Sequence, residues 1–369
     1  MKDSVKKIRD FYNQKPGASI MQREFGFFCL DKWKEQGYIN DTTNLGELFG
    51  YEDTGTYNFG ELGWCEAPFF PAFETKVLET DDEYELVQDY AGRHVKFFKG
   101  RRNGFMPTYV DHPVKDIATW ENDVKWRLNP DTPERFANLK QRMIHAQKCA
   151  QEEYIIVQSI IGGYMYLRSL IGPENLLFAF YDDPKLIHEC MKIWLEVSDK
   201  VCALHQEYVT FDEVFLAEDI CYNCSCLISD DMMREFLIPY YQQLISNIKS
   251  RQLDKNRKLH VQVDTDGNAL AVIDVYRETI GMDYMSPFEA ASGCDVVEVR
   301  KKYPDLLIRG GIDKRILAAG KDAIDREVER IMPFMKAWGG YIPTCDHGVP
   351  EEVFFEDYMH YRKRMLEYK

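Results

Sequence analysis

Residues able to do acid–base or metal chemistry gather at the ends of five short apolar runs. Carboxylates grouped with histidine or cysteine can bind a divalent metal, and burial can tune their pKa values for proton transfer. Taken singly, each of these residues is also an ordinary loop residue or helix cap. Their recurrence after five runs predicts a functional site. The runs and the residues that follow them are Glu213–Ala217 with Glu218 and Asp219, Leu259–Val263 with Asp264 and Asp266, Met282–Ser286 with Glu289, Leu306–Arg309 with Asp313 and Lys314, and Gly340–Pro343 with Cys345 and His347.

A second candidate for chemistry is the cysteine cluster Cys221-Tyr-Asn-Cys224-Ser-Cys226. Its spacing is that of part of a zinc or iron–sulfur site. No second compact group of cysteines completes such a site, since Cys294 and Cys345 stand alone in the sequence. Cysteines also pack as small apolar residues, and we interpret this cluster as structural or incidental.

The elements that must position these residues alternate between apolar runs and stretches of helical period. Unbroken apolar runs, among them Tyr154–Ser159, are typical of strands buried on both faces. Their alternation with helices predicts parallel strands joined by right-handed crossovers. Eight such units would close into a (β/α)₈ barrel with chemistry at the strand ends, whereas an open doubly wound sheet would show the same alternation. The helical stretches are Pro184–Gln206, Asp230–Ser250, Ala269–Thr279, Asp322–Lys336 and Phe355–Tyr368.

The region up to about residue 115 is rich in aromatic residues, glycine and turn signals. We predict a first barrel strand over Glu24–Cys29, a helix over Asp31–Gln36, and short strands over Phe73–Leu78 and Arg93–Phe98. These hairpins are expected to cover the barrel mouth as an N-terminal extension and cap. The fold class is therefore α/β, with residues 1–369 forming one TIM-barrel domain.

Composition and charge narrow the class of protein. With 45% hydrophobic residues among 369, the chain can bury a sizeable core. The formal net charge is −15, and no block of Lys and Arg is present, which argues against nucleic acid or an anionic membrane as a partner. The charged start, MKDSVKKIRDFYNQKP, has no apolar segment typical of a secretory signal. We expect a cytoplasmic protein with reduced thiols.

A set of motifs in matching order resembles the uroporphyrinogen-decarboxylase-like superfamily, in the branch of bacterial methyltransferases. The resemblance covers most of the chain, is weakest before about residue 60, and implies a single TIM barrel. The motifs are Glu218-Asp-Ile-Cys221, Leu227-Ile-Ser229, Pro239-Tyr-Tyr241, Asp264-x-Asp266-Gly-Asn268, Pro287-Phe-Glu289, Gly310-Gly-Ile-Asp-Lys314, and Gly340-Gly-Tyr-Ile-Pro343 through His347-Gly-Val-Pro350.

Two activities follow from this resemblance. Uroporphyrinogen decarboxylases use no metal and grip the substrate carboxylates with an N-terminal Arg-rich stretch, but Gln22-Arg-Glu-Phe-Gly26 lacks that pattern. An acidic protein is also a poor match for a substrate with eight carboxylates. Corrinoid-dependent methyltransferases instead hold zinc with a His-x-Cys motif, a late Cys-Gly and often a Glu. Asp264-x-Asp266, His347 and Glu218 occupy those positions here, so oxygen and imidazole donors replace the thiolates.

The resemblance implies a methyltransferase that moves a methyl group between a small substrate and a corrinoid (cobalamin) protein, and an aryl methyl ether is a reasonable donor. Glu218, Asp264, Asp266 and His347 are the predicted ligands of zinc or another divalent metal. Asp266 and His347 are also predicted to be catalytic, with Asp313 and Glu289 as supporting or acid–base residues. A hydrogen-bonded network without metal is the alternative for the same residues.

Early aromatic residues are candidates for the walls of a pocket for a planar ring, although each is also suited to an ordinary core. No Asp-x-His-x-x-Gly motif is present, so the corrinoid is expected on a separate partner protein. A decarboxylase without metal and a non-catalytic partner of a corrinoid carrier remain as alternatives. The aromatic candidates are Phe25, Phe27, Tyr57, Trp64 and Phe69.

Overall fold

Seven short apolar segments pair side by side as one parallel sheet in the computed structural model, which describes residues 3–18, 20–100 and 107–369. Every residue of the strands Ile155–Ile161 and Glu213–Ala217 is buried, as expected for a parallel sheet covered on both faces. The sheet order follows the chain, from β1 (Thr56–Leu62) through β6 (Ile155–Ile161), β7 (Glu213–Ala217), β8 (His260–Asp264), β9 (Tyr284–Ser286) and β10 (Leu307–Arg309) to β11 (Tyr341–Ile342).

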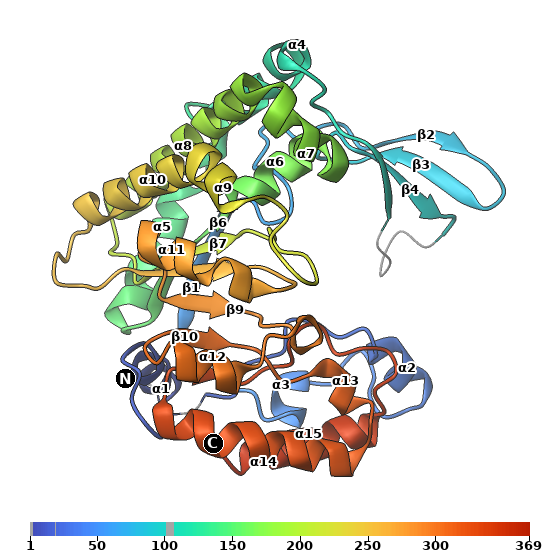
Figure 1. The fold of residues 1–369 in the computed structure, drawn as a ribbon, viewed down its shortest axis with the longest axis vertical. Coiled ribbons are helices and arrows are strands. Elements are labelled where there is room, and N and C mark those ends of the chain that lie inside the picture. Colours follow the sequence, from blue (N-terminus) through green and yellow to red (C-terminus); the bar gives the residue numbers. More distant parts are fainter. Residues whose placement is uncertain (1–2, 19, 101–106) are drawn as a thin grey trace.

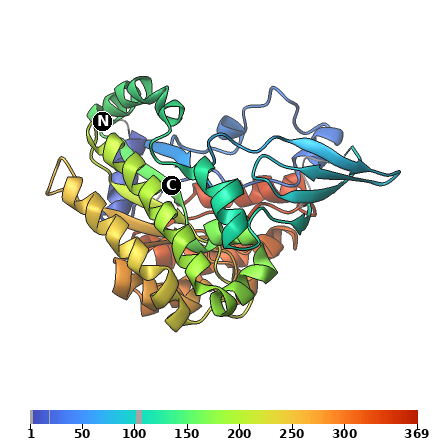
Figure 2. The same cartoon turned by 90° about the horizontal axis from the view of Figure 1, so that it is seen from above.

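Helices connect successive strands and lie outside the sheet (Figures 1 and 2). The predicted helix over Pro184–Gln206 is confirmed without change of bounds as α8. The helices of the connections are α5 (Leu139–Gln151), α6 (Gly163–Ile171), α7 (Pro173–Asp182), α8 (Pro184–Gln206), α9 (Asp230–Phe236), α10 (Ile238–Arg251), α11 (Ile273–Ile280), α12 (Val296–Lys302), α13 (Lys314–Leu317), α14 (Lys321–Trp338) and, after β11, α15 (Phe355–Leu366).

The inward-facing side chains of the sheet form a buried hydrophobic cluster, and the sheet curls around it. Ile155 and Val157 of β6 belong to the same buried cluster as Ile342 of β11, at the far edge of the sheet. Only a strongly curved sheet brings these strands together. Helix α1 (Asp3–Tyr12) contributes Ile8 and Phe11 to this cluster, so it packs against the inner face of the sheet. The architecture is therefore α/β, with a curled, parallel central sheet.

The predicted first barrel strand, Glu24–Cys29, is not one of the seven strands of the sheet. The segment Glu24–Cys29 forms one isolated parallel bridge, between Phe27 and Val349, and the edge strand of the ladder is instead β1. The side chain of Glu24 holds this segment in place, because its carboxylate accepts hydrogen bonds from the Cys345 amide at 2.6 Å and the Tyr358 hydroxyl at 3.1 Å. A buried side chain thus takes over part of the role that ladder hydrogen bonds have in a strand.

One predicted helix is divided in two. The stretch Asp230–Ser250 forms α9 and α10, which meet at Leu237. Pro239 lies in the first turn of α10, where its missing N–H costs nothing, but it cannot continue a helix from the preceding turn. Similarly, the predicted helix over Ala269–Thr279 begins with a short 3₁₀ turn before α11.

The early chain forms short helices and a separate antiparallel sheet of four strands. This small sheet extends away from the helical layer (Figures 1 and 2). Its strands β2 and β4 confirm the two short strands predicted in this region, with slightly different bounds. The strands are β2 (Lys76–Thr80), β3 (Tyr84–Gln88), β4 (His94–Phe98) and β5 (Thr108–Asp111), and the helices are α2 (Leu30–Glu35), α3 (Leu45–Leu48) and α4 (Ile117–Thr119).

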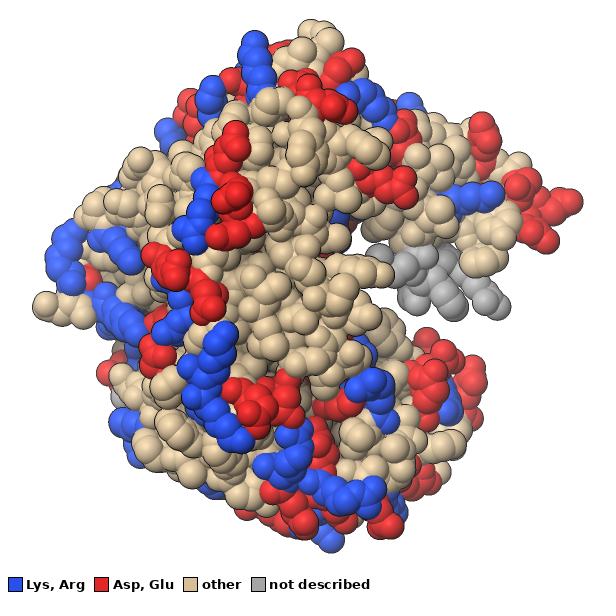
Figure 3. Space-filling view, viewed as in Figure 1, with Lys and Arg blue, Asp and Glu red and all other residues tan. Residues whose placement is uncertain are grey.

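Short turns of other helix types complete the fold: a π-helical turn at Trp120–Val124 and 3₁₀ turns at Lys125–Leu128, Pro133–Phe136, Ala269–Ala271 and Ala290–Ser292. Acidic and basic side chains are interspersed over the face seen in Figure 3. Within the described ranges, no helix has both the length and the apolar composition needed to cross a bilayer.

Candidate active site

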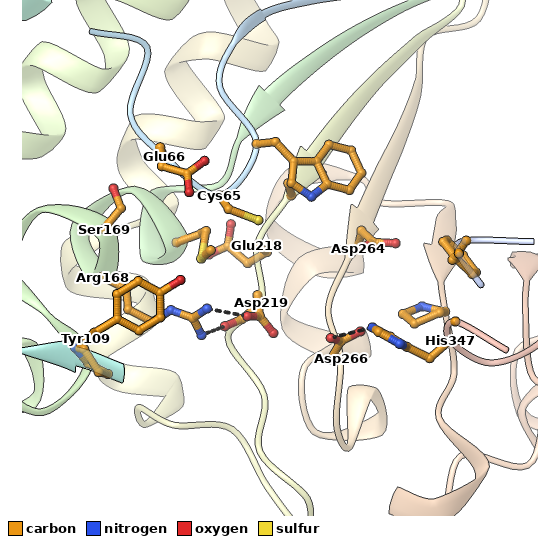
Figure 4. Close-up of a pocket in the computed structure, with 18 of the residues that line it drawn as sticks. Cys65, Glu66, Tyr109, Arg168, Ser169, Glu218, Asp219, Asp264, Asp266 and His347 are labelled. Atoms are coloured by element: carbon orange, nitrogen blue, oxygen red, sulfur yellow. Dashed lines mark hydrogen bonds and ion pairs between the residues drawn. The ribbon is translucent and has the colours of Figure 1, made fainter. Parts of the chain in front are cut away.

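A cavity of about 760 Å³ lies where the central strands end. It collects residues from the loops after β7 and β8, from the loop that follows β11, and from the small sheet. Figure 4 shows Asp219, Asp264, Asp266 and His347 around this cavity. The carboxyl ends of parallel strands are where α/β folds build their active sites, and the size suits a small molecule.

Asp264 is the last residue of β8 and points into the cavity. Its carboxylate accepts a hydrogen bond from the hydroxyl of Ser286, which lies at the end of the neighbouring strand β9. Burial nevertheless raises the pKa of Asp264 to about 7, because the charged form loses its hydration. A carboxyl group with this pKa can both donate and accept a proton near neutral pH.

His347 and Asp266 form a pair across the cavity wall. The Nε2 atom of His347 lies 3.4 Å from a carboxylate oxygen of Asp266, and a dashed line marks this contact in Figure 4. The hydrogen bond to Asp266 raises the pKa of His347, so the imidazole is more readily protonated than a free histidine. Both side chains are partly exposed, at 39% and 45%, which leaves them accessible to a bound substrate.

Glu218 lies at the back of the cavity and is fully buried. Its oxygens accept hydrogen bonds from the Tyr241 hydroxyl at 2.8 and 2.7 Å and from the Tyr164 amide at 3.3 Å. Burial raises its pKa to about 7. Gly162 makes room for this carboxylate, because a Cβ atom there would lie 1.9 Å from one of the Glu218 oxygens.

The four predicted metal ligands surround the cavity without forming one donor set. Glu218 is engaged by Tyr241, and Asp264 by Ser286, while Asp266 and His347 contact each other. Within the described part of the chain, no three His, Cys, Asp or Glu side chains converge as a metal site requires. As arranged here, these residues do not fit a bound metal, and we derive no chemical step through one. The metal remains a prediction.

The two remaining predicted residues have different surroundings. Glu289 accepts a hydrogen bond from the Gly267 amide at 2.9 Å and forms an ion pair with Lys314 at 2.8 Å. It therefore fixes the loop that carries Asp266. Asp313 instead caps α13 and pairs with Arg315 at 2.7 Å, outside the set of residues that line the cavity. Burial alone would raise the pKa of Asp313, but the hydrogen bonds and the positive charge of Arg315 together outweigh burial and lower it.

Sequence reasoning did not single out two charged residues at the site: Arg168, which lines the cavity, and Asp346, which lies beside His347. Asp219 forms an ion pair with Arg168 at 2.7 Å on the cavity wall (Figure 4). Asp346 is buried and accepts hydrogen bonds from the Ala290 and Lys314 amides, and burial raises its pKa to about 6. Asp346 directly adjoins His347, so its position after the same strand was the signal that could have found it.

Among the residues that the structure describes, the arginines in the cavity lining are Arg93 and Arg168, and both are paired with carboxylates. Arg93 donates to Glu66 at 2.7 Å and to Asp89 at 2.8 Å, and Arg168 is held by Asp219. An arginine engaged in this way offers less to an anionic substrate than a free one. These two arginines therefore offer little uncompensated positive charge to a ligand in the cavity.

Aromatic side chains form part of the rim, in partial agreement with the prediction. Phe25 and Trp64 line the cavity, together with Phe28 and Tyr109, which were not predicted. Trp64 is 51% exposed and Phe28 is 58% exposed, so both offer flat surfaces to a ligand. The other predicted aromatics pack elsewhere: Phe27 against Trp33 and Phe49, Tyr57 against Phe59, and Phe69 against Phe73.

Comparison with solved structures identifies a similar fold in a methyltransferase from Methanosarcina mazei. The TM-score is 0.57, and the alignment covers 99% of this chain and 98% of that one. Only 14% of the aligned residues are identical, so the likeness concerns the fold and not the chemistry of the site.

Curated relatives match over a shorter stretch. Uroporphyrinogen decarboxylase of Pseudomonas syringae pv. syringae is 28% identical over 130 residues, which is 34% of each chain. The same enzyme of Saccharopolyspora erythraea is 28% identical over 120 residues, or 31% of this chain and 32% of the relative. The chain thus matches about a third of the length of these relatives. The family model for uroporphyrinogen decarboxylase (URO-D) matches residues 90–367, which is most of the chain. The chain therefore belongs to the uroporphyrinogen decarboxylase family.

Proposed function

We propose that this protein is a methyltransferase that moves a methyl group between a small, weakly charged substrate and a corrinoid carried on a partner protein. An aryl methyl ether is the proposed donor. The observation that carries the proposal is the His347–Asp266 pair, 3.4 Å apart, in a cavity rimmed by aromatic side chains. A planar ring can pack on these aromatic faces while the pair supplies a proton.

The proposed reaction uses the protein's own residues for binding and proton transfer. A reduced corrinoid on the partner would supply the electron pair that bonds to the methyl carbon while the bond between that carbon and the aryl oxygen breaks. The electron pair of that bond stays on the oxygen, which takes a proton from protonated His347. Asp266 holds the imidazole and favours its charged form, as the raised pKa indicates. The products are a phenol and the methylated corrinoid.

Asp264 has a second proposed role at the same cavity. Its pKa of about 7 leaves it partly protonated at neutral pH, so it can donate a hydrogen bond to a substrate oxygen. It also takes up or releases a proton without a large cost. We assign to it the orientation of the substrate, with His347 as the proton donor.

We also infer that the curled sheet closes into an eight-stranded barrel. The segment around Phe27, which bridges Val349 beyond β11, would supply the missing strand between β11 and β1. Ile20, just before this segment, belongs to the inner hydrophobic cluster. Closure would place the loops that carry Asp264 and His347 around one mouth.

Decarboxylation without metal is the second candidate, and the family match favours it. The buried carboxyl groups with raised pKa, Asp264 and Glu218, are suited to acid–base chemistry on a substrate carboxylate. Against it, the cavity arginines Arg93 and Arg168 are both engaged by neighbouring carboxylates. A porphyrinogen with eight carboxylates would also meet an acidic wall.

The test of the proposed function is methyl transfer from 2-methoxyphenol to free cob(I)alamin, followed by the change in absorbance as the corrinoid is methylated. We expect Asp266→Asn and His347→Gln each to lower the rate by about 100-fold or more, the range that removal of a general acid gives. Asp322→Asn, on the surface at the start of α14, is the control and should retain full activity. Full activity in both site variants would contradict the assignment.

A further inference from the structure

A short hairpin follows β7, and we call its residues 220–227 the thiol hairpin. Cys221 and Cys226 form an antiparallel bridge within it. The backbone hydrogen bonds lie on either side of this pair: the Tyr222 amide donates to Ser225 at 2.7 Å, and the Leu227 amide donates to Ile220 at 2.9 Å. Cys221 and Cys226 therefore occupy a non-hydrogen-bonded position of the ladder.

This position places the side chains of Cys221 and Cys226 on the same face of the hairpin. Directly opposed residues at a non-hydrogen-bonded position have Cα atoms about 4.5 Å apart and side chains on the same face. A disulfide requires a Cα separation of roughly 4.4 to 6.8 Å, so the pair can be joined without moving the backbone. The hydrogen bond from the Cys221 thiol also lowers the pKa of Cys226, which favours its thiolate.

The two cysteines differ in access, which gives the pair an order of reaction. Cys221 is 7% exposed and Cys226 is more open, at the edge of the hairpin. A small oxidant reaches Cys226 first, and Cys221 then lies ready to resolve the product. This arrangement matches an accessible thiolate beside a resolving cysteine, the usual pattern of redox-sensitive pairs.

We propose that Cys221 and Cys226 form a reversible disulfide in exchange with small disulfides of the glutathione type. The Cys226 thiolate attacks one sulfur of the small disulfide, which breaks its S–S bond, releases one thiolate and leaves a mixed disulfide. The Cys221 thiol then loses its proton and attacks the Cys226 sulfur, which releases the second small thiol. The protein is oxidised by two electrons, and the small disulfide is reduced to two thiols.

The thiol hairpin is braced against the loop that carries Asp266. The Ile220 and Cys221 amides donate to the Thr265 hydroxyl at 3.1 Å each, and the Asn268 amide donates to the Tyr222 carbonyl at 2.8 Å. Gly267 leaves no room for a side chain, since a Cβ atom there would lie 2.7 Å from the Tyr222 carbonyl oxygen. A disulfide across the hairpin would therefore stiffen one wall of the cavity, whatever reaction takes place in it.

Two other thiols near the hairpin compete with the proposed pair for reaction with a small disulfide. Cys224 is exposed at the tip of the hairpin, and Cys294 is buried with its thiol 3.6 Å from the Gly267 carbonyl. Removing Cys224 eliminates adducts at the exposed thiol and leaves the proposed pair intact. Peptide mapping distinguishes a disulfide to Cys294 from one to Cys226, because the two cysteines lie on different proteolytic peptides.

The experiment compares Cys224→Ser with the double variant Cys224→Ser, Cys226→Ser. Each folded protein is equilibrated with glutathione disulfide, freed of reagent, unfolded in denaturant, and its free thiols are counted. We expect the first protein to lose two thiols and the second to lose none. Chymotrypsin cleaves after Tyr222, so the oxidised first protein should yield two peptides, one ending at Tyr222 and one containing Cys226, joined by a disulfide. Dithiothreitol should restore both thiols.

Three results would overturn the proposal. The first is loss of no thiols in Cys224→Ser, and the second is equal loss in both proteins. The third is a disulfide that maps to Cys294 instead of Cys226. Circular dichroism of the two variants before oxidation checks that each is folded. Counting free thiols requires no assay of catalysis. The outcome is thus independent of the proposed methyl transfer.

Discussion

Replacing Glu218 with glutamine should make the protein more stable at alkaline pH. Glu218 is fully buried, and burial raises its pKa from 4.5 to about 7. Between these two values the folded protein keeps a proton that the unfolded chain releases, so stability falls as pH rises through this window. Glutamine keeps an oxygen to accept the Tyr241 hydrogen bond and has no charge to bury.

The size of the effect follows from the same shift. Each pKa unit corresponds to about 1.4 kcal/mol, so the stability gained by Glu218→Gln should increase by about 2 to 3 kcal/mol between pH 5 and pH 8. Other carboxyl groups with raised pKa, among them Glu24, Glu213 and Asp264, also make stability fall with pH. They are present in both proteins, so the difference between variant and wild type isolates Glu218.

Urea unfolding followed by circular dichroism at pH 5 and pH 8 measures this difference. Glu352→Gln, which changes an exposed glutamate after β11, is the matched control and should follow the wild type at both pH values. If the free energies of unfolding of Glu218→Gln and wild type change in parallel from pH 5 to pH 8, Glu218 is not a buried carboxyl group with a raised pKa, and the reasoning fails.

Four further predictions concern the cavity. Ser286→Ala removes the hydrogen bond that stabilises ionised Asp264, so the pKa of Asp264 should rise further. NMR titration of the Asp264 carboxyl carbon measures this pKa. An unchanged pKa would contradict the contact. Gly162→Ala should destabilise the fold by about 2 kcal/mol or more in urea unfolding, because the new Cβ meets Glu218 and backbone atoms of the next strand. If the variant has wild-type stability, the loop can move to accommodate the methyl group. The rate of methyl transfer should fall as pH rises through the raised pKa of His347, because the protonated form is the donor; a rate that increases over this range would rule out that role. Elemental analysis of the unchelated protein tests the predicted metal: a stoichiometric divalent metal that is lost in Asp266→Ala supports the ligand set, and metal retained by that variant excludes Asp266 as a ligand.

Strands and helices that have a strong local signal were predictable from the sequence. The run Glu213–Ala217 is a strand with the predicted bounds, and Pro184–Gln206 is a helix with the predicted bounds, because an apolar run and a helical period are both local properties. The segment Glu24–Cys29 was predicted as a strand, but the sequence could not show that contacts with Cys345 and Tyr358, more than 300 residues away in the chain, hold it instead of a full ladder.

The site was predictable in position but only partly in geometry. The rule that polar residues follow the strands placed Asp264, Asp266 and His347 at one cavity, as the structure has them. The orientation of a side chain depends on its neighbours in space, and the sequence could not show that Tyr241 engages Glu218 or that Arg315 draws Asp313 away. The first contact separates Glu218 from the other predicted ligands, and the second keeps the predicted acid–base residue Asp313 out of the cavity.

The proposed reaction is methyl transfer from an aryl ether to a corrinoid. The most direct measurement is to incubate the wild-type protein with 2-methoxyphenol carrying a deuterated methyl group and free cob(I)alamin, and to analyse the corrinoid by mass spectrometry. We expect cobalamin that carries the intact deuterated methyl group, together with an equal amount of catechol. Absence of label in the corrinoid, with release of carbon dioxide from uroporphyrinogen by the same preparation, would contradict the account and assign the cavity to decarboxylation.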